Sequence, residues 1–139
     1  MILVDTNVVS ELMRSMPAPE VLAWFAGQGV AALFLSAVSE AELRAGAAYL
    51  PAGRRRDGLI TAIDAMITDD FAGRVLPFDS AAARSYAAIA ASRRAAGRPI
   101  AEADCQIAAI AHAHGAAVAT RNVADFLGCS VTVIDPWKS

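Results

Sequence analysis

The sequence predicts an α/β protein, an α/β/α sandwich around a mainly parallel sheet of five strands. Short apolar runs alternate with helical patterns along the whole chain, which is typical of layered α/β domains. The first run, at residues 2–4, is wholly apolar and mostly β-branched, as expected of a strand buried on both faces of a parallel sheet. The 139 residues are enough for one domain, spanning residues 1–139, whose core needs no disulfide.

Five short apolar runs predict the strands, each bounded by turn-forming residues. They lie at residues 2–4, 32–35, 75–78, 116–119 and 131–134. The first strand is expected to be central in the sheet.

Residues that begin or end helices bound the helical segments between these runs. Pro17 ends a helix that begins at Val8, and Gly97 and Gly115 close two later helices. The run Arg54–Arg56 is expected in a loop before an amphipathic helix whose apolar residues recur four apart. After the first helix, the expected helices lie at residues 20–27, 40–49, 57–71, 80–96 and 102–114, with a short turn or helix at 125–126.

The composition narrows the class of protein. Hydrophobic residues make up 56% of the chain, much of it Ala, which indicates tightly packed helices and an apolar face for a partner chain. No apolar run approaches the ~18 residues of a membrane span, and Asp5 interrupts the first run, so neither a membrane segment nor a signal peptide is expected. Cys105 and Cys129 lack the spacing of a metal pair, which favours reduced thiols in the cytoplasm. The net charge of −2 argues against indiscriminate coating of nucleic acid.

A polar segment directly follows the first predicted strand. Asp5, Thr6 and Asn7 stand where that strand ends, and ligands of open parallel sheets sit just outside the carboxyl ends of the strands. A carboxylate at this place suits metal or phosphate chemistry. The alternative is that Asp5 or Asn7 only caps the next helix.

Three further acids occupy comparable places. Glu42 follows the second strand, and Gly46 lies one turn further on the same helix face, where a missing side chain lets backbone or ligand approach. Asp104 lies in the first turn of a helix that is apolar nearly all round, and Asp125 follows the fourth strand. Each has a structural alternative: the helix dipole favours Asp104, Asp125 fits a turn, and Glu42 can face solvent, with Glu40 as a rival on another face.

The predicted topology brings these acids together. Segments that follow the first, second and fourth strands emerge at the same edge of a doubly wound sheet. Asp5, Glu42 and residues 120–125 are expected to meet there, and Asp104 joins them if its helix points its amino end the same way. Carboxylates so close raise one another's pKa unless a cation lies among them. Mg²⁺ or Mn²⁺ suits such oxygen ligands, and the chemistry that follows is metal-assisted hydrolysis of a phosphodiester.

Four linked motifs resemble the PIN-domain ribonucleases, specifically the VapC/FitB toxins of bacterial toxin–antitoxin pairs. They read MILVDTNVVSE at 1–11, LSAVSEAELRAG at 35–46, IAEADCQIAA at 100–109 and ATRNVADF at 119–126, and a closing DPW looks like the FitB branch. The resemblance covers the whole chain in the right order and implies a PIN-like fold.

The resemblance also implies roles for individual residues. The implied catalytic and metal-coordinating acids are Asp5, Glu42, Asp104 and Asp125. Branches of the family carry the fourth acid either where this chain has Asn122 or at the place of Asp125, and only Asp125 is acidic here. The residues expected to orient ligands or substrate, directly or through water, are Thr6, Asn7, Thr120 and Asn122.

The partners are implied in the same way. Members of the family dimerise, cleave single-stranded or looped RNA, and are held inactive by a small antitoxin. The antitoxin inserts a side chain, often Arg, into the acidic pocket and binds operator DNA. The main alternative is a binding module that acts through the antitoxin–DNA complex with little cleavage. A phosphoacceptor of the phosphatase or receiver type fits less well, because Asn7 stands where the phosphatase pattern needs a second acid, and the single lysine, Lys138, lies at the tail.

Overall fold

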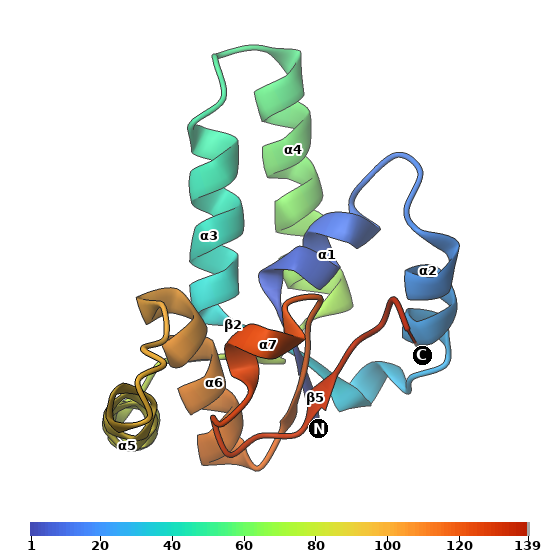
Figure 1. Ribbon diagram of the computed structural model, residues 1–139. Helices are drawn as coiled ribbons and strands as arrows, with labels where there is room; N and C mark the ends of the chain where they lie inside the picture. The colour runs from blue at the N-terminus through green and yellow to red at the C-terminus, as the bar shows by residue number, and fades with distance from the viewer. Residues whose placement is uncertain (139) are drawn as a thin grey trace.

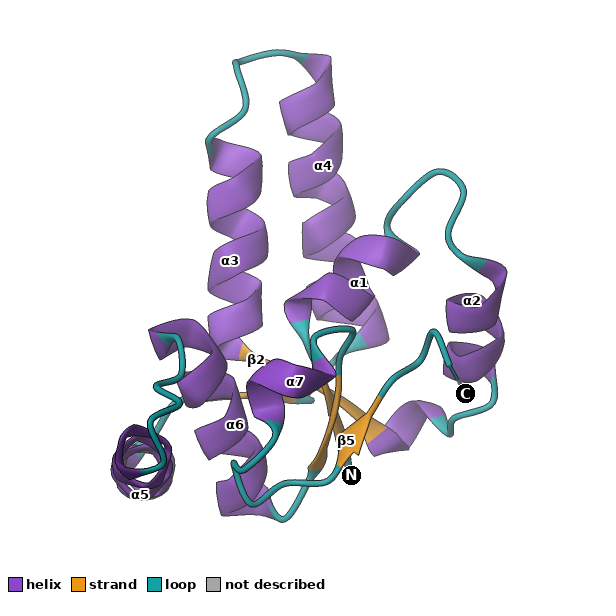
Figure 2. Ribbon diagram, in the orientation of Figure 1, coloured by secondary structure: helices purple, strands orange, loops and turns teal. Residues whose placement is uncertain are grey.

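The computed structural model describes residues 1–138 and forms an all-parallel sheet of five strands with helices around it (Figures 1 and 2). The order of the strands across the sheet is β3-β2-β1-β4-β5. The strands are β1 (Ile2–Val4), β2 (Leu33–Ser36), β3 (Val75–Leu76), β4 (Ala117–Ala119) and β5 (Val133–Ile134). The parallel sheet with a central first strand is therefore confirmed, although the last three strands are shorter than their apolar runs.

The helices connect these strands in chain order. They are α1 (Thr6–Leu12), α2 (Pro19–Ala26), α3 (Ala37–Ala48), α4 (Arg54–Ala65), α5 (Ser80–Ala95), α6 (Glu102–His114) and α7 (Val123–Phe126). A 3-10 turn, η1 (Val30–Ala32), precedes β2, and a π-helical turn, η2 (Met66–Asp70), continues α4. None of the described helices is long and apolar enough to cross a membrane.

Helices cover both faces of the sheet because successive strand residues point to opposite sides. Leu3 belongs to one buried cluster, with side chains of α5 and α6 such as Ile89 and Ile110. Val4 belongs to the other, with side chains of α1, α2 and η2. Both Leu3 and Val4 are fully buried, as expected of a strand covered on both faces. This arrangement confirms the α/β/α sandwich.

Two local predictions are wrong. The run Arg54–Arg56 forms the first turn of α4 rather than a loop, because Gly53, at φ 152°, makes the turn and arginine is a good helix former. Helix α3 begins at Ala37, because the Ser36 hydroxyl accepts the N–H of Ser39 at 2.9 Å and caps it. A Cβ at Gly46 would meet no atom within 4 Å, so no backbone packs against it, and the expected approach of a ligand there stays a prediction.

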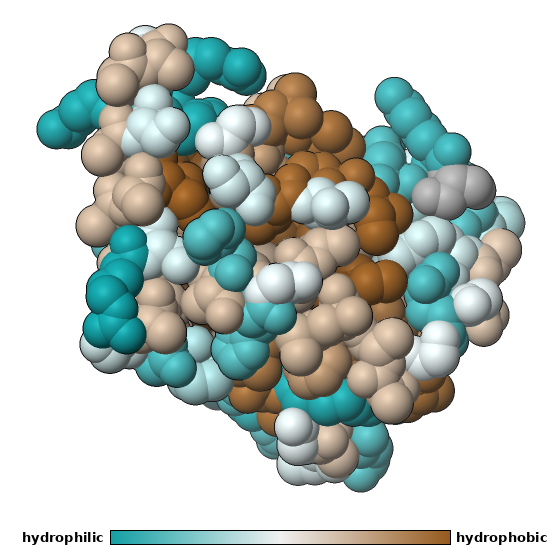
Figure 3. Space-filling view, turned by 90° about the horizontal axis from the view of Figure 1, so that it is seen from below, coloured by the Kyte–Doolittle hydropathy of each residue, from teal (hydrophilic) through white to brown (hydrophobic). Residues whose placement is uncertain are grey.

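Helices α3 and α4 form a hairpin that projects beyond the sheet (Figure 1). Apolar residues also reach the surface of the face seen from below (Figure 3). Large apolar side chains exposed elsewhere along the chain include Met16, Val30 and Tyr49. Part of the unusual hydrophobic content is thus outside the core. The expected apolar face for a partner chain stays a prediction.

Candidate active site

Strand β1 carries Asp5 to the carboxyl edge of the sheet. The backbone N–H of Asp5 donates to the carbonyl of Ala119 at 2.8 Å, which extends the pairing of β1 with β4 by one residue. Asp5 Oδ1 accepts the N–H of Thr6 at 2.8 Å, and Asp5 is the N-cap of α1. The neighbours of β1 are β2 on one side and β4 on the other, so Asp5 lies where the strand order reverses. Asp5 thus caps a helix and stands at the ligand-binding edge as well.

A second set of hydrogen bonds fixes the other oxygen of Asp5. Thr120, fully buried after β4, donates its hydroxyl to Asp5 Oδ2 at 2.8 Å, and Asn7 Nδ2 donates to the same oxygen at 3.2 Å. The Thr120 hydroxyl in turn accepts the backbone N–H of Asn122 at 3.0 Å. Three residues predicted to orient ligands therefore hold one carboxylate in place. Asp5 is 4% exposed, so its orientation is set by these bonds rather than by solvent.

Thr6 connects Glu42 to the same centre. The Thr6 hydroxyl lies 2.8 Å from Glu42 Oε1 and 2.9 Å from the hydroxyl of Ser39. A carboxylate only accepts, so Thr6 donates to Glu42 and accepts from Ser39. The rival acid, Glu40, is turned elsewhere and pairs with Arg44 at 2.8 Å. Of the two acids in this helix, Glu42 faces Asp5.

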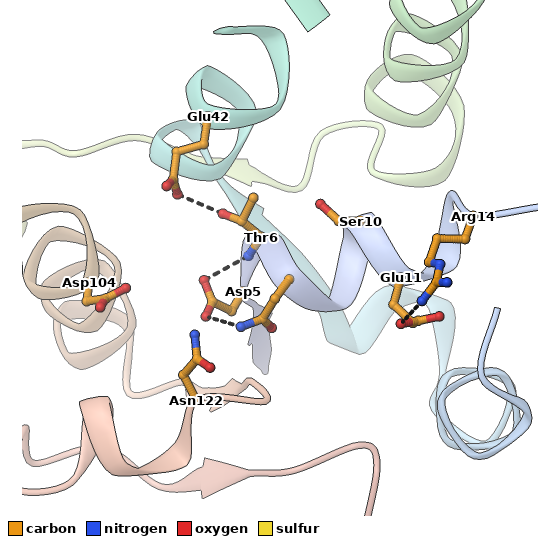
Figure 4. Close-up of a pocket in the computed structure, with 9 residues that line it drawn as sticks. Asp5, Thr6, Ser10, Glu11, Arg14, Glu42, Asp104 and Asn122 are labelled. Carbon is orange, nitrogen blue, oxygen red and sulfur yellow. Dashed lines mark hydrogen bonds and ion pairs between the residues drawn. The ribbon is translucent and has the colours of Figure 1, made fainter. Parts of the chain in front are cut away.

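An open pocket of about 510 Å³ lies in front of Asp5. Figure 4 shows Glu42 on α3 and Asp104 on α6 reaching into the same space. The described residues that line it are Asp5, Thr6, Asn7, Ser10, Glu11, Arg14, Glu42, Asp104 and Asn122. Three of the four predicted acids thus come together. The fourth, Asp125, lines a neighbouring pocket, and Asn122 lines both.

The carboxylates perturb one another. Desolvation, followed by the charges of Asp5, Asp125 and Glu42, raises the pKa of Asp104 to about 6. Burial also raises the pKa of Asp5, against the hydrogen bonds from Thr120 and Thr6, with smaller contributions from Glu42 and Asp125. None of the ion pairs found in residues 1–138 involves Asp5, Glu42 or Asp104. Among the described residues, the charges of Asp5, Glu42 and Asp104 are therefore not neutralised by an ion pair.

The raised pKa of Asp104, caused first by desolvation and then by the neighbouring charges, leads to a prediction for stability. Because the pKa of Asp104 is raised on folding, the folded state binds its proton more tightly, and the stability of the wild type falls as pH rises from about 4 to about 6. Asn resembles the neutral carboxyl. Without added metal, Asp104→Asn is expected to raise Tm by about 2–4 °C at neutral pH and to leave it unchanged near pH 4. Thermal unfolding in EDTA at both pH values measures this; an equal gain at both would contradict it.

A row of polar side chains on α1 and just after it also lines the pocket and was not among the predicted site residues. Ser10, Glu11 and Arg14 also line the pocket, and Glu11 is 7% exposed and pairs with Arg14 at 3.4 Å. With Asn7 they recur at the three- and four-residue spacing that places side chains on one helix face. That spacing was the available signal. Glu11 also accepts the N–H of Ala18 at 3.0 Å, which ties the end of α1 to the start of α2.

Fold and site together define an α/β/α domain with an acidic pocket at the carboxyl edge of a parallel sheet. Comparison of the sequence with known protein families identifies the particular family. The family model of the PIN domain matches residues 2–126, so the chain belongs to the PIN domain family.

Named relatives are similar over nearly their whole length. The chain is 46% identical to VapC ribonuclease Y4jK of Sinorhizobium fredii, over 99% of both chains. It is 42% identical to toxin FitB of Neisseria gonorrhoeae, again over 99% of both. Among solved structures, FitAcB from Neisseria gonorrhoeae superposes with a TM-score of 0.94 at 42% identity, covering 100% of both chains. FitAB bound to the IR36 DNA fragment superposes with a TM-score of 0.92 at 42% identity, covering 99% of this chain and 96% of that chain.

Proposed function

We propose that this protein is a metal-dependent endoribonuclease toxin that hydrolyses RNA phosphodiesters and is neutralised by a cognate antitoxin. The observation that carries the proposal is the convergence of Asp5, Glu42 and Asp104, from three separate elements, on one pocket. Membership of the PIN domain family and likeness to a VapC ribonuclease and a FitB toxin support it.

The donor set of the pocket fits a hard divalent cation. Within residues 1–138, no group of three or more His, Cys, Asp or Glu side chains is placed so that it could hold a metal ion as it stands. Mg²⁺ does not need such a group, because it keeps several waters and is bound through one or two carboxylates plus substrate phosphates. The unneutralised charge around Asp104 favours a cation, and oxygen ligands favour Mg²⁺ or Mn²⁺.

The proposed roles follow from the contacts of each side chain. Asp5, fixed by three hydrogen-bond donors, is the direct metal ligand, and Asp104 and Glu42 complete the shell or orient water. Thr6 holds Glu42, and Thr120 holds Asp5. A bound divalent ion supplies a lowered pKa for a water and stabilises charge that develops on the phosphate oxygens.

The proposed reaction is an in-line displacement at phosphorus. Water attacks the phosphorus atom, its proton passes to a pocket carboxylate or to solvent, and the bond to the 3′ oxygen breaks. The leaving 3′ oxygen takes up a proton, so the products carry a 5′-phosphate and a 3′-hydroxyl. Asp125 is proposed to act through its charge, since it influences Asp5 and Asp104 from the adjoining pocket, with Asn122 between the two spaces.

An antitoxin is proposed to neutralise the toxin at this pocket. The structures of FitAcB and of FitAB on DNA support such a partner and contact with operator DNA through it. Three carboxylates without an internal ion pair suit an inserted arginine of the antitoxin. The homodimer and the cytoplasmic location stay predictions.

The test is cleavage of an unstructured RNA by the purified protein. Cleavage is expected with Mg²⁺ or Mn²⁺, none in EDTA, and the fragments should carry 5′-phosphate ends that a phosphatase removes. A protein that binds RNA or antitoxin but cuts nothing in either metal is the binding module instead. Cleavage that continues unchanged in EDTA would contradict metal dependence.

A further inference from the structure

A second pocket adjoins the acidic one and is lined by two cations. It has a volume of about 480 Å³, and Arg121 and Lys138 line it together with Asn122, Asp125 and Asp135. Asn122 lines the acidic pocket as well, so the two spaces share a wall. A chain lying across Asn122 would pass from the acids to these two cations.

The backbone at Arg121 is tied to the acid cluster. Its N–H donates to Asn7 Oδ1 at 3.3 Å, and the preceding residue, Thr120, donates to Asp5. The position of residue 121 is therefore fixed relative to the atoms that would cut the substrate, although the Arg121 side chain itself is exposed.

The Arg121 guanidinium is held by an aromatic ring rather than by an acid. It lies over the indole of Trp137, 4.9 Å from the ring centroid, and no ion pair of residues 1–138 involves it. Stacking occupies one face of the guanidinium and leaves its edge of N–H donors available. That edge matches the oxygens of a phosphate, which a guanidinium binds through two parallel hydrogen bonds.

The carboxylates of the acidic pocket repel an RNA strand, and a nearby cation would offset that repulsion. RNA is a polyanion, the chain has a net charge of −2, and the pocket gathers carboxylates. A cation beside the acids lowers the cost of bringing the strand to them. Asp125 and Asp135 line the same pocket and reduce its net charge, so the contact is expected to position the strand rather than to bind it tightly.

We propose that Arg121, braced by Trp137, binds a phosphate of the RNA strand that flanks the phosphate to be cut, with Lys138 beside it. The inference rests on the proposed ribonuclease function and assigns to it a positioning residue outside the acidic pocket.

The test measures RNA binding apart from cleavage. A fluorescent single-stranded RNA is titrated in EDTA against the Asp5→Asn protein and against the same protein carrying Arg121→Ala, and anisotropy gives Kd at several salt concentrations. Arg121→Ala is expected to raise Kd about 10-fold and to reduce the salt slope by about 0.7, the value for one lost phosphate contact on a single strand. Arg121→Lys, which keeps the charge without the planar fork, should retain the slope and recover part of the affinity.

The matched control is Arg84→Ala. Arg84 is exposed on α5, where it donates to the hydroxyl of Ser80 at 3.1 Å, and it lines neither pocket. Its loss should leave Kd and the salt slope unchanged. If Arg121→Ala binds RNA like its parent while the wild type cleaves RNA, the phosphate contact is wrong and the ribonuclease function stands. If the wild type neither binds nor cleaves RNA, the proposed function fails and this contact fails with it.

Discussion

Asp5→Asn is expected to lower the rate of RNA cleavage by more than about 100-fold and to leave the protein folded. Loss of a residue that only hydrogen-bonds a metal ligand lowers metal affinity or activity by about 10–100-fold. Loss of the charged ligand itself should lower the cleavage rate by more than that. The fold should survive because Asn keeps one oxygen for the N–H of Thr6. The other position becomes an amide N–H₂. The Thr120 hydroxyl can rotate to accept from it, and the longer bond from Asn7, at 3.2 Å, is lost.

Single-turnover cleavage of a labelled RNA with saturating Mg²⁺ measures this effect. The matched control is Asp69→Asn, which removes an exposed carboxylate that lines neither the acidic pocket nor its neighbour. The control should cleave at the wild-type rate. Equal activity of the wild type and Asp5→Asn would remove Asp5 from the catalytic centre, and the metal-dependent mechanism would go with it.

Phe126→Ala is expected to lower the free energy of unfolding by about 3–5 kcal/mol, the usual cost of truncating a buried Phe. Phe126 is fully buried in the cluster formed by α5 and α6. For a chain of this length, Tm should fall by on the order of 10 °C or more. Urea unfolding followed by circular dichroism measures the change.

The neighbouring residue supplies the control. Leu127 is 46% exposed, and Leu127→Ala should change stability by less than about 0.5 kcal/mol.

Phe126 also anchors α7, whose N-cap is Asn122. The buried guanidinium of Arg93 holds the same segment by donating to the carbonyls of Asp125 and Leu127. A loss for Leu127→Ala as large as that for Phe126→Ala would show that the segment is not anchored through the ring.

The sequence predicted most of the sheet and its acidic edge because both depend on local patterns. Wholly apolar runs identified the strands, and the alternation with helices required parallel pairing. Helix α6 was predicted at its observed bounds because Gly115 adopts the left-handed conformation at φ 64° and ends it. Asp5 stands at the end of β1, and Asp104 lies in the first turn of α6, the helix that leads into β4. A helix that leads into a parallel strand begins near the carboxyl edge of the sheet, so both acids reach one pocket there.

The remainder depended on tertiary contacts that no local pattern encodes. Glu11 and Arg14 form a local pair at a spacing of three residues, which is typical of the polar face of an ordinary helix. Only the tertiary fold shows that this face lines the acidic pocket. Asp125 lies one turn of α7 beyond Asn122 and lines the adjoining pocket. The spacing of three residues in the sequence does not show which pocket Asp125 lines.

The hydrogen bond between Thr120 and Asp5 joins residues 115 apart in the sequence, and it has a consequence for synthesis of the chain. During translation the amino-terminal half leaves the ribosome first, when neither β4 nor Thr120 exists to complete the central sheet. A nascent chain therefore lacks the group that orients its principal carboxylate. The acidic site of this chain is therefore completed only after β4 and Thr120 have been synthesised and β4 has paired with β1.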